Sequence, residues 1–350
     1  MRMEEQRLDE RGKDMTAVAG EVIVPGAPAI QGLVLRHFRG DEDYPAMLEV
    51  NNGSKITDGM QHDLHTLETL THTYSTTPNH DPTRDTLIAE VDGEMVAFNR
   101  VFWERELEGA LVFWHFGFAL PEWRGKGLGR AMLDWVEGRA REIARTLDGG
   151  ENAYSSTMVN ATARGLENLL KDTGYEPVRY EFHMETRDLN HIPDVPMPEG
   201  LEIRPVKPED YRKVWEASVE AFRDHWGAVE VDESDFERTM SDPNNDPKLW
   251  VVAWDGDEVA GSILNFVNPE YNMRMGRKLG YTESISVRRP WRRKGLARAM
   301  LAHSMKMHKN MGMAQTALGV DTQNPSGALD LYQSMGYEVV TKYTTYRKKI

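Results

Sequence analysis

Cysteine is missing from all 350 residues of the sequence. Its absence excludes disulfide bonds, zinc sites built on thiolates and covalent catalysis by a thiol, and it suits a cytoplasmic protein. Long apolar runs are missing too, since none approaches the roughly 18 residues that a membrane-spanning helix needs. Residues 1–14 are charged and have no apolar stretch typical of a secretory signal. We therefore expect neither a membrane partner nor secretion.

Positive charge is also in deficit, because 42 Lys and Arg face 56 Asp and Glu, for a formal net charge of −14. So acidic a chain is poorly suited to holding the phosphates of DNA or RNA, and we expect no nucleic-acid partner. The acidity is compatible with a cationic substrate such as an amine, although a solvated acidic surface is the simpler explanation.

An internal repeat organises the chain. Gly32-Leu33-Val34-Leu35-Arg36 is echoed by Gly200-Leu201-Glu202-Ile203-Arg204, and Trp123-Arg124 is echoed at the same spacing by Trp291-Arg292. A repeat of this length indicates duplication of a whole domain. Three prolines in the intervening segment indicate a linker. We expect a flexible segment over 1–29, a first domain over 30–187, a Pro-rich linker over 188–199 and a second domain over 200–350.

Hydrophobic periodicity predicts the same mixture of elements in each half. In the first half it predicts strands over 33–36, 86–91, 95–103, 111–120, 157–159 and 178–186, and helices over 41–50, 128–143 and 163–172. Mixed strands and helices with an early antiparallel hairpin indicate an α/β (α+β) fold, with helices flanking a mixed sheet in each half.

Two similar turns each follow an apolar strand and precede a helix, at residues 124–129 and 292–297, and both read Arg-x-x-Gly-x-(Gly/Ala). A turn that opens a helix presents free backbone N–H groups, and the helix dipole adds positive potential there. Small residues let a ligand approach the backbone closely. The pattern indicates a cradle for a diphosphate, with Arg and Lys adding mobile positive charge, and it is present twice.

In the second half the cradle is followed by Asn324, Ala328, Tyr332 and Gly336-Tyr337. The cradle and this block together resemble the acyl-CoA signature of the GNAT N-acetyltransferase superfamily, and the two copies are similar to its tandem two-domain members. The resemblance implies that each central sheet is splayed and that the pantetheine arm of acetyl-CoA lies in the splay. It implies donor contacts from these residues: Ser286, Val287, Arg288, Arg292, Arg293, Lys294, Gly295, Leu296, Ala297 and Asn324.

The activity that the resemblance implies is transfer of an acetyl group, without a metal, to the primary amine of a small molecule in the second domain. Amine attack on a thioester needs a base and an acid. Residues 283, 285 and 287 would face one side of a strand over 281–288, so Glu283 would share a face with Val287 and could act as the base. An N–H at Val287 could polarise the thioester carbonyl. The alternative for Glu283 is a carboxylate paired with an arginine or facing solvent.

Tyr332 is implied by the resemblance as the acid that protonates the departing thiolate. The alternative is a ring packed in the core. Asn324, which precedes a proline, is also a good candidate for a helix N-cap.

The first half departs from this pattern, because Leu170, Thr162 and His115 match Tyr332, Asn324 and Glu283 in order. A leucine cannot donate a proton, and a histidine among aromatic residues favours a core position. We therefore expect the first half to bind acyl-CoA weakly or not at all and to serve as scaffold and as half of the substrate cleft. A possible second donor site there would comprise Phe118, Ala119, Arg124, Gly125, Lys126, Gly127, Leu128 and Gly129.

The sequence says least about which residues bind the acceptor amine. Asp224, His225 and Trp226 follow the first helix of the second half, where the resemblance implies a loop over the acceptor, although a helix-ending turn is the alternative. We expect solvent-facing histidines at 62, 65, 72 and 80, with a metal site at His62 and His65 as the alternative. We expect a solvated hairpin tip over 268–280, with a mobile lid or a contact with CoA phosphates as the alternatives. Two other functions stay open: acetylation of proteins or peptides, and a non-catalytic acyl-CoA sensor, against which Tyr332 argues.

Overall fold

The computed structural model describes residues 20–324 and 326–350. The first half contains β1 (Leu33–His37), α1 (Tyr44–Thr57), α2 (Leu67–Thr76), α3 (Pro82–Asp85), β2 (Thr86–Val91), β3 (Glu94–Arg105), β4 (Leu111–Ala119), α4 (Leu128–Ala144), β5 (Ala153–Asn160), α5 (Arg164–Asp172) and β6 (Glu176–Thr186). The second half contains β7 (Glu202–Ile203), α6 (Tyr211–Phe222), α7 (Glu233–Ser241), β8 (Trp250–Asp255), β9 (Glu258–Val267), α8 (Pro269–Met275), β10 (Leu279–Val287), α9 (Leu296–Asn310), β11 (Gln315–Asp321), α10 (Ala328–Ser334) and β12 (Tyr337–Lys349).

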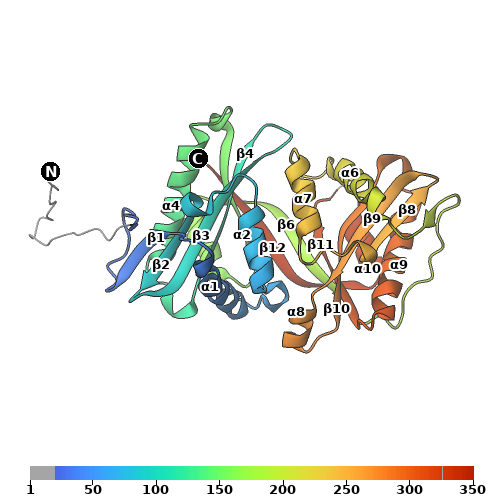
Figure 1. Ribbon diagram of the computed structural model, residues 1–350, viewed down its shortest axis with the longest axis horizontal. Coiled ribbons are helices and arrows are strands. Elements are labelled where there is room, and N and C mark those ends of the chain that lie inside the picture. Colours follow the sequence, from blue (N-terminus) through green and yellow to red (C-terminus); the bar gives the residue numbers. More distant parts are fainter. Residues whose placement is uncertain (1–19, 325) are drawn as a thin grey trace, which may run out of the picture.

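One sheet of twelve strands runs through the described part of the chain, in the order β1-β2-β3-β4-β5-β12-β6-β11-β10-β9-β8-β7 (Figure 1). The strand that we expected to close the first half, β6, lies between two strands of the second half, β12 and β11. The last strand of the chain, β12, pairs in turn with β5 of the first half. The halves thus exchange their final strands and share one sheet.

Helices cover both faces of the sheet in each half, because strand side chains alternate between faces and both faces are apolar. In the first half Met47 of α1 packs in a cluster with Phe98, and Val136 of α4 packs in a cluster with Phe113. In the second half Val214 of α6 packs with Trp250, and the methionines of α9 pack with Ile263 and Leu318. The expected fold class, mixed sheet strands flanked by helices in two tandem units, is confirmed.

Two parallel strand pairs diverge within the sheet. In the second half β10 and β11 pair only from Leu279–Gln315 to Tyr281–Ala317, although both strands continue beyond that point. In the first half β4 and β5 pair only from Leu111–Ala153 to Trp114–Ser156. Each divergence leaves backbone N–H and C=O groups without a strand partner on one side of the strand. An extended ligand can bind to these groups in the opening between the two strands.

Two expectations about irregular segments need correction. The described end of the expected flexible segment is anchored, because Val22 N–H bonds Leu35 O and Val24 is buried; residues 1–19 lie outside the described part. The region 268–280 is not a hairpin tip, since it contains helix α8, capped by Asn268. The linker packs on the second core through Leu189 and neighbouring apolar residues.

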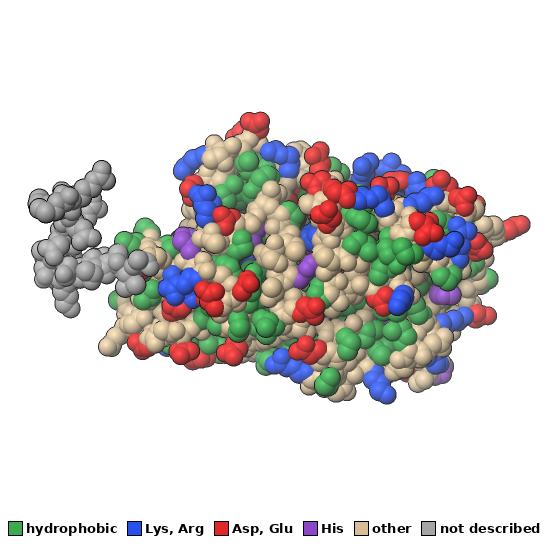
Figure 2. Space-filling model, in the orientation of Figure 1, with side chains coloured by type: hydrophobic (Ala, Val, Ile, Leu, Met, Phe, Trp, Pro, Cys, Tyr) green, Lys and Arg blue, Asp and Glu red, His purple; other side chains and the backbone are tan. Residues whose placement is uncertain are grey.

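The face shown in Figure 2 carries acidic and basic side chains interspersed, with no large patch of one sign. Histidine side chains are visible near the middle of this face. Helices α2 and α7 flank the middle of the sheet, where β6 and β12 cross between the halves (Figure 1).

Candidate active site

A cavity of about 950 Å³ opens where β10 and β11 diverge. It brings together most of the residues predicted from the second half, although they come from three separate stretches of the chain. From the predicted set, the lining residues are Asp224, His225, Trp226, Glu283, Ser286, Val287, Arg292, Arg293, Gly295, Leu296, Ala297, Asn324 and Tyr332. Arg288 and Lys294 do not line it. The guanidinium of Arg288 is instead paired with Glu220 and Glu258.

The cradle at the mouth of this cavity has a left-handed backbone at two positions. Gly295 caps α9 with φ 84°, and Arg293 has φ 64°. Gly125 and Gly127 of the first half have φ 72° and 91° at the equivalent positions. A left-handed arginine costs about 1 kcal/mol relative to glycine. The second half therefore keeps a charged side chain beside the helix N-terminus where glycine would be less strained.

Arg292 is a structural bridge, so the expectation of mobile charge at this position is wrong. Its Nε donates to Val287 O at 2.9 Å, Nη2 donates to Ala221 O at 3.0 Å, and Nη1 contacts Asp224 at 2.7 Å. The side chain thereby ties the end of β10 to the end of α6. Hydrogen bonds from Arg289 and Arg292 hold the pKa of Asp224 well below its usual range. Asp224 is thus already paired, which argues against its expected contact with a cationic acceptor.

Glu283 lies beside a β-bulge that changes the expected side-chain alternation. Glu283 is opposite Leu264 and Ser286 is opposite Ser262, so β10 has one residue more than β9 in this interval. Ser284, inside the bulge, has φ 49°. Because the extra residue shifts the alternation, Ser286 and not Val287 shares the face of Glu283. The expectation that residues 283, 285 and 287 face one side is therefore wrong.

The carboxyl group of Glu283 is suited to proton transfer near neutral pH. Burial raises its pKa to about 7 from the ordinary 4.5, with no ionic partner contributing to the shift. The expected alternative, pairing with an arginine, is thus absent for this carboxylate. A carboxyl group that is half deprotonated near pH 7 has the acidity that general-base catalysis favours.

Tyr332 is 6% exposed and lines the same cavity from α10. Burial raises its pKa, and the neighbouring Tyr337 and Glu283 raise it further, so the hydroxyl stays protonated and can donate a proton. Asn324 lies in the turn before α10, but the expected N-cap role is wrong, since Gly327 is the N-cap. The amide oxygen of Asn324 accepts the N–H of Ser326 at 2.8 Å.

The two remaining residues of the expected acceptor loop lie on the donor side. Two guanidinium groups lie over the ring of Trp226, with Arg347 4.2 Å and Arg179 5.4 Å from its centroid. His225 packs edge-on against Phe222, and burial lowers its pKa. These contacts fit the alternative that we considered, a helix-ending turn, and leave the acceptor to be sought elsewhere.

A second cavity, of about 380 Å³, lies between the halves. Its first-half residues are in and after a short 3₁₀ turn, η2 (Gln61–Asp63), in α2, and in strands β5 and β6. Its lining comprises His62, Asp63, Leu64, His65, Thr69, His72, Thr73, Met158, His183, Asp242, Asn244, Phe266, Asn268, Tyr281, Glu283 and Tyr343. Within the described part of the chain, Glu283 is the one lining residue that this cavity shares with the larger one.

Sequence reasoning missed most of this second cavity. His62 does not face solvent as expected, because its ring packs in the cavity wall and contacts the hydroxyl of Tyr343. Burial and the charge of His183 lower its pKa to about 4. One signal was available: Arg179, Glu181, His183 and Glu185 alternate along β6, so their side chains share one face. That charged face would have pointed to a polar cleft, although not to which strands border it.

The equivalent cradle in the first half is closed. Arg124 makes the same bridge as Arg292, through Asp58 at 2.6 Å. Thr162 Oγ1 donates directly to Asp58 O. The equivalent residues of the second half, Asn324 and Asp224, instead line the open cavity. Pro28 also packs on the cradle, since a Cβ at Gly127 would lie 3.3 Å from its Cβ.

The other expected donor residues of the first half have contacts within the protein. Lys126 lies over the ring of Trp123 at 4.4 Å, and Phe118 packs against Phe98. His115, 5% exposed, lies 3.3 Å from the hydroxyl of Tyr175, and burial lowers its pKa to about 4. His115 is therefore a core residue.

The acetyltransferase (GNAT) family model matches residues 51–159 and again 211–337, which together exceed half of the chain. The chain belongs to the GNAT acetyltransferase family, and it carries the family domain twice. A mycothiol acetyltransferase of Paenarthrobacter aurescens is 26% identical over 221 residues, which are 62% of this chain and 64% of that relative. The chain thus matches less than two thirds of that relative's length.

Two solved structures agree with the tandem arrangement. A GCN5-related N-acetyltransferase from Sphaerobacter thermophilus has a TM-score of 0.71 and 25% identity, covering 91% of this chain and 96% of its own. A tandem GNAT protein from the clavulanic acid biosynthesis pathway has a TM-score of 0.64, covering 91% and 98%, and at 14% identity it shows the fold alone. The tandem arrangement of two GNAT domains is therefore shared with solved structures.

Among residues 20–324 and 326–350, no helix is both long and apolar enough to cross a bilayer. No group of three or more His, Cys, Asp or Glu side chains in these residues has an arrangement that could hold a metal ion.

Proposed function

We propose that this protein transfers an acetyl group from acetyl-CoA to the primary amine of a small, polar molecule, and that the second half performs the chemistry. One observation carries the proposal: Glu283 lines both the cavity beside the cradle and the cavity between the halves. A base at the junction of a donor cavity and an acceptor cavity is where an amine would have to lose its proton.

The donor would lie in the larger cavity. Backbone N–H groups at the start of α9, with the side chain of Arg293, would hold the diphosphate of CoA. The pantetheine arm would lie in the opening between β10 and β11, whose backbone has no strand partner there. That route leads from the cradle toward Glu283 and Tyr332, which both line the cavity.

The acceptor would lie in the smaller cavity, with its amine toward Glu283. Glu283 would take a proton from the amine as the nitrogen attacks the thioester carbonyl. Collapse of the tetrahedral intermediate would break the C–S bond, and the Tyr332 hydroxyl would protonate the departing thiolate. The products would be an N-acetylated amine and free CoA, and the proton on Glu283 would return to Tyr332 through solvent.

The first half would bind no acyl-CoA. The support is the bond between Thr162 and Asp58, together with Pro28 on the cradle and Leu170 in place of the tyrosine. Replacing Gly127 in the full chain should therefore leave donor binding unchanged.

The test is release of free CoA thiol by the purified full chain with acetyl-CoA and a panel of amines: ethanolamine, glucosamine, tyramine, spermidine and a lysine-containing peptide. We expect thiol release with a small amine, lost in Glu283→Gln and in Tyr332→Phe. Release with the peptide alone would favour the protein or peptide acetyltransferase. Binding of acetyl-CoA without release for any amine would favour the sensor.

A further inference from the structure

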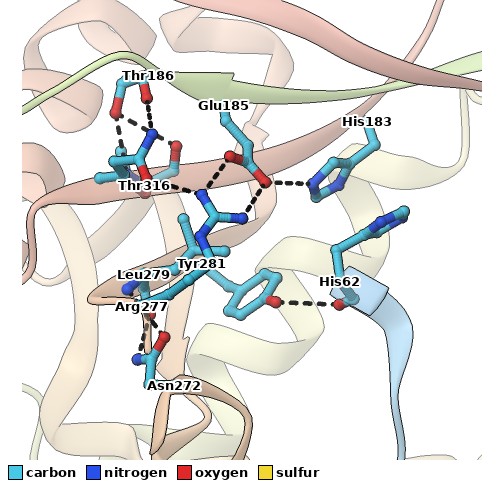
Figure 3. A network of polar contacts seen from close by, with 10 residues as sticks. His62, His183, Glu185, Thr186, Asn272, Arg277, Leu279, Tyr281 and Thr316 are labelled. Carbon is cyan, nitrogen blue, oxygen red and sulfur yellow. Dashed lines mark hydrogen bonds and ion pairs between the residues drawn. The ribbon is translucent and has the colours of Figure 1, made fainter. Parts of the chain in front are cut away.

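His62 is held in the wall of the smaller cavity by groups from both halves of the chain. Its ring stacks on that of His183, with centroids 4.3 Å apart and planes 22° apart. Its Nε2 lies 2.6 Å from the hydroxyl of Tyr343. The hydroxyl of Tyr281 donates to the backbone oxygen of His62 at 3.1 Å (Figure 3). Strands β6, β12 and β10 therefore all fix one residue of the first half.

An ion pair between Glu185 and Arg277 contacts the stacked histidines through His183 (Figure 3). His183 Nε2 lies 3.2 Å from Glu185 Oε1, and Arg277 donates to both oxygens of Glu185 at 3.0 and 2.6 Å. Burial alone would raise the pKa of Glu185, but hydrogen bonds from His183 and Arg277 lower it to about 2. The carboxylate is therefore charged and fully paired, and the ring that it orients is His183.

His62 faces the cavity without a charge of its own. His62 is neutral at pH 7, because burial and His183 lower its pKa to about 4. The nearby carboxylate of Asp63 is paired with Lys55 at 2.8 Å. The rest of the wall presents the hydrogen-bonding groups of Thr69, Thr73, Asn244 and Asn268 and the carboxylate of Asp242, whose Oδ1 accepts the N–H of Asn244 at 2.7 Å. Glu283 is thus a carboxylate of this cavity that no ion pair neutralises.

We propose that His62 and Tyr343 are positioning residues for the acceptor, so that the half without the chemistry selects the amine that is acetylated. This proposal rests on the proposed function and extends it. The hydroxyl of Tyr343 fixes the His62 ring, and the ring together with the hydroxyl groups of Thr69 and Thr73 on α2 aligns a polar amine with Glu283. The pair touches no reacting atom, and its action is through the orientation of the acceptor.

The test compares Tyr343→Phe and His62→Gln with wild type in the full chain. Tyr346→Phe is the matched control, because Tyr346 lies on the same strand, donates to Glu167 at 3.0 Å and lines neither cavity. With the best amine of the panel, we expect KM for the amine to rise roughly threefold to tenfold in both variants, the value of one hydrogen bond. KM for acetyl-CoA should stay within about twofold.

Selectivity is the second measurement, since loss of structure alone would lower the rates with all amines equally. The ratio of kcat/KM between the two best amines should change in His62→Gln and stay constant in Tyr346→Phe. Unchanged amine KM and ratio, or equal changes in both KM values, would overturn the positioning role while the proposed function stands. Absence of amine-dependent thiol release in wild type would instead overturn the proposed function, and this inference with it.

Discussion

Replacing Glu283 with Gln tests the proposed chemistry most directly. Gln is nearly the same size as Glu but cannot take a proton, so kcat should fall by about a hundredfold or more, the usual contribution of a general base. KM for acetyl-CoA should change little, because the cradle of residues 292–297 is untouched. The assay is thiol release under saturating acetyl-CoA, with the amine varied.

The pH profile gives the sharper form of this prediction. With a pKa of about 7, Glu283 is deprotonated in about one tenth of molecules at pH 6 and about nine tenths at pH 8. A carboxyl group at its ordinary 4.5 would be almost fully deprotonated at both values. Wild-type kcat should therefore lose about tenfold per unit below pH 7, and this acidic limb should be absent from the residual activity of Glu283→Gln.

Protonation of the amine itself would produce a similar limb, and the variant separates the two causes. If the limb belongs to the amine, it persists unchanged in Glu283→Gln. Glu338→Gln serves as the control, since Glu338 pairs with Arg187 on the surface and lines neither cavity. Full activity in Glu283→Gln, or a limb near pH 7 that survives the substitution, would refute the reasoning.

As pH rises, the free energy of unfolding should decrease whereas activity should increase. A pKa raised from 4.5 to about 7 means that the folded state favours the protonated acid, so stability is lost as pH rises from 4.5 through 7. A shift of that size corresponds to about 3 kcal/mol. Glu283→Gln should unfold at a higher temperature than wild type at pH 8, with little difference at pH 4.5. An equal difference at both pH values would contradict the assigned burial of the carboxylate.

Three further predictions concern the donor site and the buried histidines. Tyr332→Phe should lower kcat by about a hundredfold without changing KM for acetyl-CoA, and a normal kcat would remove Tyr332 from the mechanism. Gly295→Ala should weaken acetyl-CoA binding in calorimetry, because φ 84° disfavours a side chain, whereas Gly127→Ala should not. Acid should destabilise the protein between pH 6.5 and 4, since burial lowers the pKa of His115 and His308 from 6.5 to about 4, and each then contributes up to about 3 kcal/mol of loss. Melting temperatures that are constant across that range would contradict this.

The strand exchange explains why each half needs the other. Without β12, strand β5 would expose an edge, and without β6 so would β11. The exchange also brings Tyr343 and His183 beside His62, so the cavity between the halves is a product of the same pairing.

Local patterns in the sequence were enough for most of the predicted elements and for the cradle, although not for helix α8. The periodicity of strands and helices, the repeat and the Arg-x-x-Gly turns depend on neighbouring residues, and such features can be recognised without a structure. The loss of the tyrosine from the first half, with Leu170 in its place, could also be seen by aligning the chain with itself. Most of the donor residues predicted in the second half lie around one cavity for this reason, although their roles stay predictions.

Long-range pairing decided the rest. The bulge that moves Ser286 to the face of Glu283 depends on the register with β9, and the pairing of Asp224 depends on where Arg292 reaches. The environment that raises the pKa of Glu283 is a matter of burial, which no spacing encodes. The sequence alone therefore determined that there are two cradles and which one retains its tyrosine. Only the tertiary structure decided that a second cavity adjoins Glu283, because the wall of that cavity includes the strands β6 and β12 that the two halves exchange.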